Sequence, residues 1–314
     1  MPSAEVMSDV LPPGTRLAGR YIVREPLGQG GMAHVYRGDH DTIARPVAIK
    51  VLNRALSRQP SIVVRFMQEA RASSKVRHEN VVEVTDFGET DDGRPFMVME
   101  FLEGEDLGRT LHRDGPLSWE RARPILVQIL AALQAAHDKS VIHRDMKPEN
   151  VFRTRLMGSD DFIKVFDFGI AKVLLGDDGS PAQPLTLEGQ VMGTPAYMSP
   201  ELCLGETIDA RSDLYAVGVI AYQMLTGRTP FRSDRSALIL HHQVHQALPK
   251  MSETAPDVKV DRGIEQKIAR ALAKKRDDRY ASAREFADAL LVGTAPESSG
   301  GLLPGLRSLF RRNK

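Results

Sequence analysis

The spacing of hydrophobic residues differs on the two sides of residue 103. Before it, β-branched and aromatic residues alternate or cluster between glycine and polar breaks, a pattern typical of strands. Five strands are predicted in this way, at residues 21–30, 34–40, 45–53, 81–90 and 96–104. Between the third and the fourth, apolar residues recur every three or four positions, which predicts one main helix over 61–76.

After residue 103 the pattern favours helices. Residues 119–139 have the apolar spacing of a long amphipathic helix, with Ser118 as its expected N-cap. Two short strands are predicted at 151–155 and 162–166, and helical spacing dominates residues 212–291. A strand-rich region followed by a helix-rich region predicts an α+β fold with two lobes.

These patterns divide the chain into four segments. We expect a flexible lead-in over residues 1–20, a small strand-rich lobe over about 21–102, a larger helical lobe over about 103–292, and a linker-like basic tail over 293–314. The lead-in is polar and carries Pro12, Pro13 and Gly14, which disfavour regular structure.

Composition narrows the class of protein. Hydrophobic residues make up 42% of the 314 residues, enough for a packed core, and the formal net charge of +1 argues against a nucleic-acid partner. Cys203 is the only cysteine, which fits a reducing compartment. The most apolar stretch, residues 216–225, is too short to span a bilayer and is predicted to be a buried helix. We therefore expect a cytoplasmic chain with no membrane span.

Two short strings concentrate the chemistry. Residues 143–150 read HRDMKPEN and residues 167–169 read DFG. Asp145 can accept the proton of an attacking hydroxyl, and Lys147 can sit beside a moving phosphoryl group. Asn150 and Asp167 offer the hard oxygen ligands that Mg²⁺ prefers. Together the strings favour phosphoryl transfer with Mg²⁺.

A glycine-rich stretch and a lysine supply a candidate nucleotide site. Residues 27–35 read LGQGGMAHV, and such glycines let a backbone approach phosphates, although a glycine-rich stretch alone can also be an ordinary hairpin turn. Lys50 lies in the apolar string VAIK at 47–50, and a lysine there needs an anionic partner. Glu69, on the predicted helix, and the phosphates of ATP would both serve.

The order of these motifs resembles that of eukaryotic-type Ser/Thr protein kinases, in particular the bacterial branch of that family. The resemblance covers about residues 21–292 and continues through GTPAYMSPE at 193–201, SDLYAVGVI at 212–220 and DDRY at 277–280. One departure is Ala33, which stands where the third glycine of the loop often lies. The resemblance implies a two-lobed protein-kinase fold, with ATP and Mg²⁺ as the nucleotide and the metal.

The resemblance also assigns roles in ATP binding. The three loop glycines would cover the triphosphate, Lys50 would contact the α- and β-phosphates, and Glu69 would hold Lys50. Val35, Ala48 and Phe152 would enclose the adenine, with Met99 at the back of the slot, while the Glu100 carbonyl and the Leu102 amide would bond the adenine edge. The implied nucleotide-binding residues are Leu27, Gly28, Gly30, Gly31, Val35, Ala48, Lys50, Met99, Glu100, Leu102 and Phe152.

The same resemblance implies which groups accept the phosphate and how the activity is regulated. Lys147 and Thr194 are placed as in Ser/Thr-directed members, where the threonine bridges Asp145 and the lysine, so protein Ser and Thr hydroxyls are the implied acceptors. Arg144 would pair with a phosphorylated residue of the activation loop, residues 167–201. Thr186 is our candidate for autophosphorylation, although a loop threonine with no role is the plainer alternative; Ser180 is a second candidate, and Glu188 would supply a standing negative charge.

Further expectations concern structure and alternatives. We expect a buried ion pair between Glu201 and Arg279, and Asp213 capping the backbone near His143, itself a packing residue. His241 and His245 are expected to have a surface or packing role, and Cys203 to be a small semi-buried side chain. A pseudokinase scaffold would lack Lys50, Asp145, Asn150 or Asp167, and a small-molecule phosphotransferase would not need the GTPAYMSPE segment. Whether two kinase copies pair transiently during activation stays open.

Overall fold

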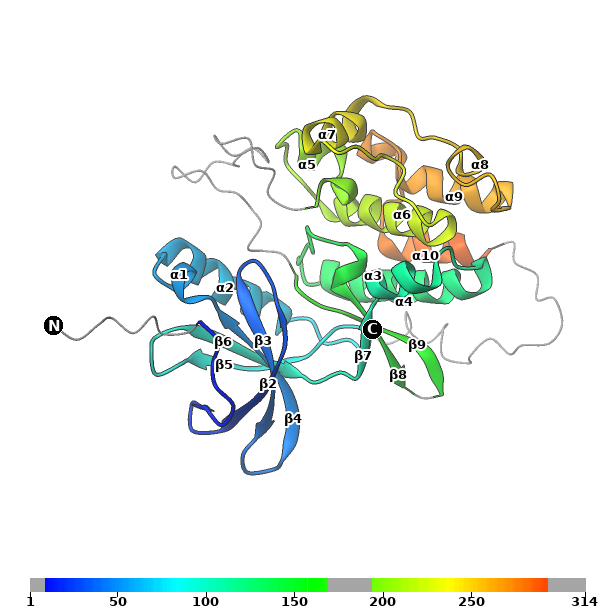
Figure 1. Cartoon of the computed structure of the whole chain (residues 1–314). Coiled ribbons are helices and arrows are strands. Elements are labelled where there is room, and N and C mark those ends of the chain that lie inside the picture. Colours follow the sequence, from blue (N-terminus) through cyan, green and yellow to red (C-terminus); the bar gives the residue numbers. More distant parts are fainter. Residues whose placement is uncertain (1–8, 157, 169–193, 293–314) are drawn as a thin grey trace. The chain divides into compact units, whose positions relative to one another are not determined.

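The protein is described from a computed structural model, over residues 9–156, 158–168 and 194–292 (Figure 1). The chain divides into two compact units. The first comprises residues 1–75 and 82–103, and the second comprises residues 76–81 and 104–314. The predicted division near residue 103 therefore corresponds to a boundary between units, and the second unit also takes in a short piece of the strand-rich part of the chain.

The first unit is built on a six-stranded antiparallel sheet with the order β1-β2-β3-β4-β6-β5. Its strands are β1 (Arg16–Leu17), β2 (Tyr21–Gln29), β3 (Ala33–His40), β4 (Arg45–Leu52), β5 (Val84–Glu89) and β6 (Pro95–Glu100), and its helices are α1 (Arg54–Ser57) and α2 (Pro60–Ser73). The five predicted strands and the predicted main helix are confirmed.

The start of the chain differs from the expected lead-in. Of residues 1–20, the described residues 9–20 form part of the first unit, because β1 pairs with β2 and the side chains of Leu11 and Leu17 are buried in the core. The Leu11 N–H also donates a 2.9 Å hydrogen bond to the Tyr36 hydroxyl. Two isolated leucines between prolines and glycines are too sparse for a periodic signal, yet each buries its side chain when the segment lies on the sheet.

The second unit is mainly helical, as predicted. Its helices are α3 (Leu107–Asp114), α4 (Trp119–His137), α5 (Pro200–Cys203), α6 (Ala210–Thr226), α7 (Ser236–His245), α8 (Met251–Thr254), α9 (Arg262–Ala271) and α10 (Ala283–Leu291), with 3₁₀ turns at Pro148–Asn150, Pro195–Tyr197 and Arg276–Asp278. A small antiparallel sheet contains β7 (Gly104–Asp106), β8 (Val151–Leu156) and β9 (Ser159–Val165) in that order.

Helices α4 and α6 form the core of the second unit. Most of their residues are buried, including nearly all of the apolar stretch 216–225, which confirms the expected buried helix. The Ser118 side chain accepts from the Arg121 N–H, as predicted for the N-cap of α4. In the part of the chain that the structure describes, no helix is both long and apolar enough to cross a bilayer.

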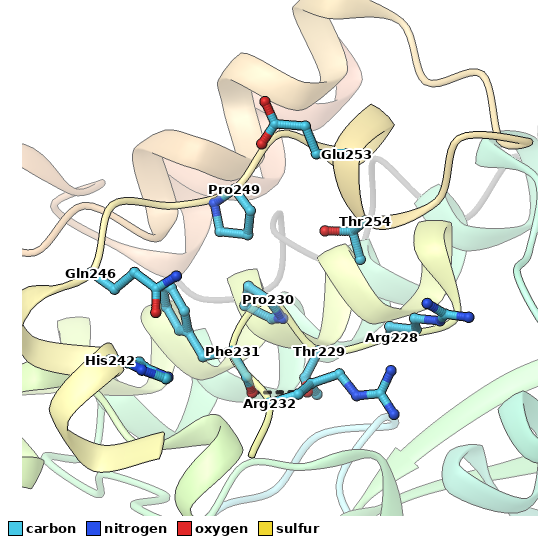
Figure 2. Close-up of a pocket in the computed structure, with 10 residues that line it drawn as sticks. All are labelled: Arg228, Thr229, Pro230, Phe231, Arg232, His242, Gln246, Pro249, Glu253 and Thr254. Atoms are coloured by element: carbon cyan, nitrogen blue, oxygen red, sulfur yellow. Dashed lines mark hydrogen bonds between the residues drawn. The ribbon is translucent and has the colours of Figure 1, made fainter. Parts of the chain in front are cut away.

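A surface hollow of about 340 Å³ lies in the second unit (Figure 2). It is bordered by α7, by α8 and by the residues that follow the C-terminal end of α6. The buried side chain of Phe231 and the neighbouring Pro230 contribute apolar surface to it, while Arg228, Arg232 and Glu253 supply charge. The described residues that line it include none of the predicted site residues, so the site is built elsewhere.

Candidate active site

Lys50 and Glu69 form an ion pair inside the first unit. The Lys50 Nζ lies 2.9 Å from the Glu69 Oε1, and the two side chains are only 13% and 9% exposed. Strand β4 carries the lysine and helix α2 carries the glutamate. The predicted pairing is confirmed, and it meets the requirement that a lysine in an apolar strand find an anionic partner.

One face of the sheet gathers the residues expected around the nucleotide. Val35 lies directly opposite Lys50, and Ala48 lies directly opposite Met99, so each pair shares a face. Ala48 and Lys50 are two residues apart on β4, which puts all four residues on the same face. Alternate residues of β4, including Ile49, belong to the buried cluster on the other face. The first unit therefore presents small and apolar side chains next to an anchored lysine.

The glycines of the β2–β3 hairpin are not required by the packing of the chain. A Cβ added at Gly28 or Gly31 would meet no atom within 4 Å, and one at Gly30 would meet only the Ala33 carbonyl at 3.7 Å. None of the three has a positive φ. Close backbone approach by a ligand is one physical reason for glycines here, and it fits the phosphates of ATP. Leu27, just before them, leaves a large apolar side chain 45% exposed.

The loop over residues 143–150 of the second unit, called the catalytic loop below after its predicted role, brings three predicted residues together. The Asn150 Nδ2 donates to the Asp145 carbonyl at 2.7 Å and to the Asp145 Oδ2 at 3.1 Å. The Lys147 Nζ lies 3.4 Å from the same carboxylate oxygen. Asp145 keeps some solvent access, with 14% of its side chain exposed. The lysine and the amide hold this carboxylate in one orientation, in which it can accept a proton from a neighbouring hydroxyl.

Asp213 anchors the backbone of this loop from α6, as predicted. Its side chain is buried, and its two oxygens accept the N–H groups of His143 and Arg144 at 2.8 and 2.9 Å. Burial alone would raise the pKa of Asp213. The hydrogen bond with His137 and the nearby charges have a larger opposite effect, so the pKa lies below its ordinary value. An ionised Asp213 can accept every one of these bonds.

His143 is a packing residue, which confirms the prediction. Its side chain is fully buried, its ring lies 4.8 Å from that of Phe168, and its Nε2 bonds the Phe166 carbonyl at 3.0 Å. Burial lowers the pKa of His143, which favours the neutral imidazole. The residue thus links the catalytic loop to the segment that carries Asp167.

Asn150 and Asp167 are adjacent in the fold because β8 pairs with β9. The Phe166 N–H donates to the Asn150 carbonyl at 3.1 Å, next to the Val151–Val165 pair. Asp167 has a φ of 55°, which is strained for a residue with a side chain, and such strain is concentrated at functional sites. An amide oxygen and a carboxylate on neighbouring strand ends fit a magnesium ion.

The remaining predicted nucleotide residues lie in both units. Glu100 ends β6 and Leu102 follows it in the first unit, whereas Phe152 lies on β8 of the second unit, with its ring 6.4 Å from that of Phe166. The structure therefore groups the predicted residues within each unit, with Lys50 and Glu69 in one and Asp145, Lys147, Asn150 and Asp167 in the other.

The regulatory predictions are only partly covered by the structure. Arg144 has a φ of 67°, and its buried Nε has no hydrogen-bond partner among the described residues. Thr194 is half-buried, and no described hydrogen bond joins it to Asp145 or Lys147. Thr186, Ser180 and Glu188 lie outside the described residues. Arg144 thus offers an unsatisfied donor, which a phosphate could bond.

The predicted ion pair between Glu201 and Arg279 is present and fully desolvated. Two hydrogen bonds of 2.7 Å join the guanidinium to the carboxylate, and the side chains are 5% and 0% exposed. The Ser212 hydroxyl donates to the same carboxylate at 2.6 Å. Burial raises the pKa of Glu201, and the bonds from Arg279 more than offset this, so the pKa is lowered. The pair fixes α5, which contains Glu201, the last residue of the activation loop.

Two structural residues were not predicted from the sequence. Gln243 of α7 is fully buried and donates to the Pro195 and Ala196 carbonyls at 3.1 and 2.7 Å, while it accepts from the Tyr215 hydroxyl at 2.5 Å. His137 supports Asp213 as described above. A polar residue on an otherwise apolar helical face is the signal that could have identified Gln243.

Three residues with other potential chemistry, Cys203, His241 and His245, lie where a packing or surface role was expected. Cys203 is half-buried, and burial raises the pKa of its thiol to about 12. His241 and His245 are exposed on α7 with their rings 4.8 Å apart, and no group of three metal-ligating side chains occurs among the described residues.

Comparison with known proteins identifies the family. Residues 21–291 match the protein kinase domain family. The serine/threonine-protein kinase pkn3 of Myxococcus xanthus is 43% identical over 273 residues, which cover 87% of this chain and 50% of that protein. The serine/threonine-protein kinase PknB of Mycolicibacterium smegmatis is 37% identical over 288 residues, covering 90% of this chain and 44% of that protein. The chain thus spans half or less of the length of these relatives.

The fold agrees with this assignment. The crystal structure of the Mycobacterium tuberculosis PknI kinase domain has a TM-score of 0.68 and 28% sequence identity to this chain, covering 90% of this chain and 98% of that one. The chain belongs to the protein kinase family, and its similarity is to bacterial serine/threonine kinases.

Proposed function

We propose that this chain transfers the γ-phosphate of ATP to serine or threonine hydroxyls of proteins. The observation that carries the proposal is the catalytic loop, in which Asp145 is bonded by Asn150 and lies 3.4 Å from Lys147. The buried Asp213 holds the backbone of this loop through two hydrogen bonds. This arrangement suits a base that must be ionised and held in one orientation.

The chain's own residues would bind the nucleotide. Lys50, kept extended by Glu69, would contact the phosphates, and the backbone at Gly28, Gly30 and Gly31 leaves room for them. Asn150 and Asp167 would hold Mg²⁺. When bound, this ion neutralises charge on the phosphate oxygens.

Asp145 would orient the acceptor hydroxyl and take its proton. As the bond between the hydroxyl oxygen and the γ-phosphorus forms, the bond from that phosphorus to the β–γ bridging oxygen breaks, and ADP leaves with the electron pair. Lys147 would stabilise charge on the transferred group, and Thr194 would orient Asp145 and Lys147. Lys147 and Thr194 favour Ser and Thr acceptors, as do the names of the relatives.

Regulation would act through Arg144. Its partly buried guanidinium has an unsatisfied Nε, and a phosphate on Thr186 would supply a charge-assisted partner. A transient pair of kinase copies would allow this phosphorylation to occur between chains. Mass spectrometry of active protein should find Thr186 phosphorylated, and an unmodified Thr186 would contradict this part.

We propose residues 21–292 as the kinase domain, with lobes over about 21–102 and 103–292, and the described residues 9–20 pack on the first of them. Residues 293–314, predicted from the sequence to be a linker-like tail, lie outside the described residues. We place its activity in the cytoplasm, with protein substrates and no nucleic-acid partner, in line with the formal net charge of +1.

Incubation with γ-labelled ATP and a generic protein substrate tests the proposal. Wild-type protein should label serine or threonine in the substrate, and Asp145→Asn should abolish most of the transfer. Label on a small molecule alone would favour a small-molecule phosphotransferase, and absence of label despite ATP binding would favour a pseudokinase. Transfer that survives Asp145→Asn would refute the assignment of the base.

A further inference from the structure

Asp9 joins three parts of the first unit that are distant in sequence. Its Oδ1 accepts the Arg54 N–H at 2.8 Å, and its Oδ2 lies 3.2 Å from the His34 Nε2. The Arg94 guanidinium donates to the Asp9 carbonyl at 2.7 Å and lies 3.3 Å from its Oδ1. Asp9 thus contacts β3 through His34, the start of α1 through Arg54, and the residue before β6 through Arg94.

The partners of Asp9 are buried. The side chains of His34 and Arg94 are 6% and 2% exposed, although Asp9 itself is 38% exposed. Arg94 is also bonded by Asp92, which in turn pairs with Arg54. Burial raises the pKa of Asp9, but the Arg54 N–H and His34 lower it more, so the carboxylate is ionised at neutral pH. Removal of Asp9 would leave Arg94 with a single carboxylate partner among the described residues.

Two of the three contacts lead directly to the glycine-rich hairpin. His34 pairs with Gln29 across the hairpin, and the intervening residues 30–33 form its tip. Asn53, next to Arg54, donates its N–H to the Met32 carbonyl at 2.9 Å and its Nδ2 to the Gly31 carbonyl at 3.4 Å. Asp9 therefore contacts His34, which directly follows the tip, and Arg54, which is the neighbour of Asn53. Asn53 in turn bonds the tip.

The glycines themselves provide little restraint on the tip. A Cβ at Gly28 or Gly31 would meet nothing within 4 Å, and of residues 30–33 it is Ala33 that is buried, where it pairs with Leu52 of β4. A loop of this kind loses conformational entropy when it closes over a ligand, and restraint supplied beforehand reduces that loss. The only described hydrogen bond across the tip is from the Gly30 N–H to the Ala33 carbonyl, at 2.9 Å. Beyond the pairing of Ala33 and His34 with β4, contacts at His34 and Asn53 restrain the tip from outside.

We propose that Asp9 is a positioning residue for ATP binding, which holds the glycine-rich hairpin in place through His34 and through the Asn53–Arg54 segment. This inference rests on the proposed function, because it assumes that the hairpin covers the phosphates. It assigns to the segment before β1 a role in nucleotide affinity, and none in the transfer step, since Asp9 belongs to the first unit and the residues of the catalytic loop to the second.

The test compares ATP affinity in matched variants of the full chain. Asp9→Ala removes the anchor, and Asp9→Asn keeps an acceptor for the Arg54 N–H but removes the charge. Asp41→Ala is the control. Asp41 also contacts the segment at the start of the chain, through a 2.5 Å ion pair with Arg16, but it follows the end of β3 that is far from the glycines. Isothermal titration with ATP and Mg²⁺ gives Kd, and steady-state kinetics give KM for ATP and kcat.

We expect Asp9→Ala to raise Kd and KM for ATP about tenfold, with kcat at saturating ATP nearly unchanged and with Asp41→Ala like wild type. Asp9→Asn should have an intermediate effect, and it carries the test if Asp9→Ala does not fold. Wild-type affinity in the folded Asp9 variants, or an equal loss in Asp41→Ala, would overturn the inference. Failure of wild-type protein to bind ATP would instead refute the proposed function.

Discussion

Arg279 donates two hydrogen bonds of 2.7 Å to the carboxylate of Glu201, 78 residues away in the sequence, and the two side chains are 0% and 5% exposed. The Arg279 guanidinium also donates to the Ala273 carbonyl at 2.8 Å and lies over the Tyr215 ring. The pair therefore connects the end of the activation segment to α6 and to the segment after α9.

Removal of one partner of this pair should be severely destabilising. Glu201→Ala leaves the Arg279 charge buried, so we expect the free energy of unfolding to fall by about 3–5 kcal/mol. Chemical denaturation of both proteins measures this difference. As a control, Asp277→Ala removes an ion pair between Arg211 and an aspartate that is 84% exposed, and it should cost about 0–1 kcal/mol. Equal effects of the two substitutions would contradict the account.

Glu201 should also contribute to stability in a pH-dependent way. Its folded pKa lies below the ordinary value of 4.5, so its contribution is fully present above about pH 4.5. As the pH falls from there through the folded pKa, the unfolded state takes up the proton first, and stability is lost. In this range the free energy of unfolding should therefore depend more steeply on pH for wild type than for Glu201→Gln. Parallel pH profiles would be inconsistent with the assigned shift.

Asp213 should affect turnover rather than ATP affinity. Asp213→Asn turns an amide toward the N–H groups of His143 and Arg144, which need an acceptor. We expect kcat to fall about 10²-fold through misplacement of Asp145, with Kd for ATP within about twofold of wild type. Circular dichroism should confirm that the variant folds. A kcat close to wild type would show that the loop does not depend on this anchor.

Cys203 should be unreactive in the native protein. Burial raises the pKa of its thiol to about 12, so almost no thiolate exists at pH 8. A disulfide reagent such as DTNB should react with it slowly in buffer and quickly in denaturant. Because Cys203 is the only cysteine, the absorbance reports on this thiol alone. Rapid reaction in buffer would contradict the buried environment.

The sequence predicted those parts of the fold and site that depend on local pattern. The apolar string VAIK put Lys50 on a strand of the first unit, and helical spacing put Glu69 on α2. Their pairing followed from the cost of burying a lone lysine. Asp145 and Asn150 lie within one short string, and the chain between them allows few arrangements. Such features are specified by residues close together in the sequence.

Other contacts could not be predicted because they form between distant residues that carry no local signal. Asp9 is one aspartate in a polar segment, and only the folded sheet brings Arg54 and Arg94 to it. Gln243 could be suspected of being buried from its helical face, but the sequence does not indicate its bonds to the Pro195–Tyr197 turn, because the partners are 47 and 48 residues away. Tertiary packing decides the role of both residues.

The central claim, that Asp145 is the base for transfer to a protein hydroxyl, is tested most directly by single-turnover phosphoryl transfer from γ-labelled ATP. Asp145→Asn keeps the size of the side chain and removes its charge, and Asp160→Asn makes the same change at an aspartate that is 70% exposed. We expect Asp145→Asn to reduce the transfer rate by about 10²–10⁴-fold with ATP affinity retained, and Asp160→Asn to match wild type. A transfer rate in Asp145→Asn equal to that of Asp160→Asn would contradict the account.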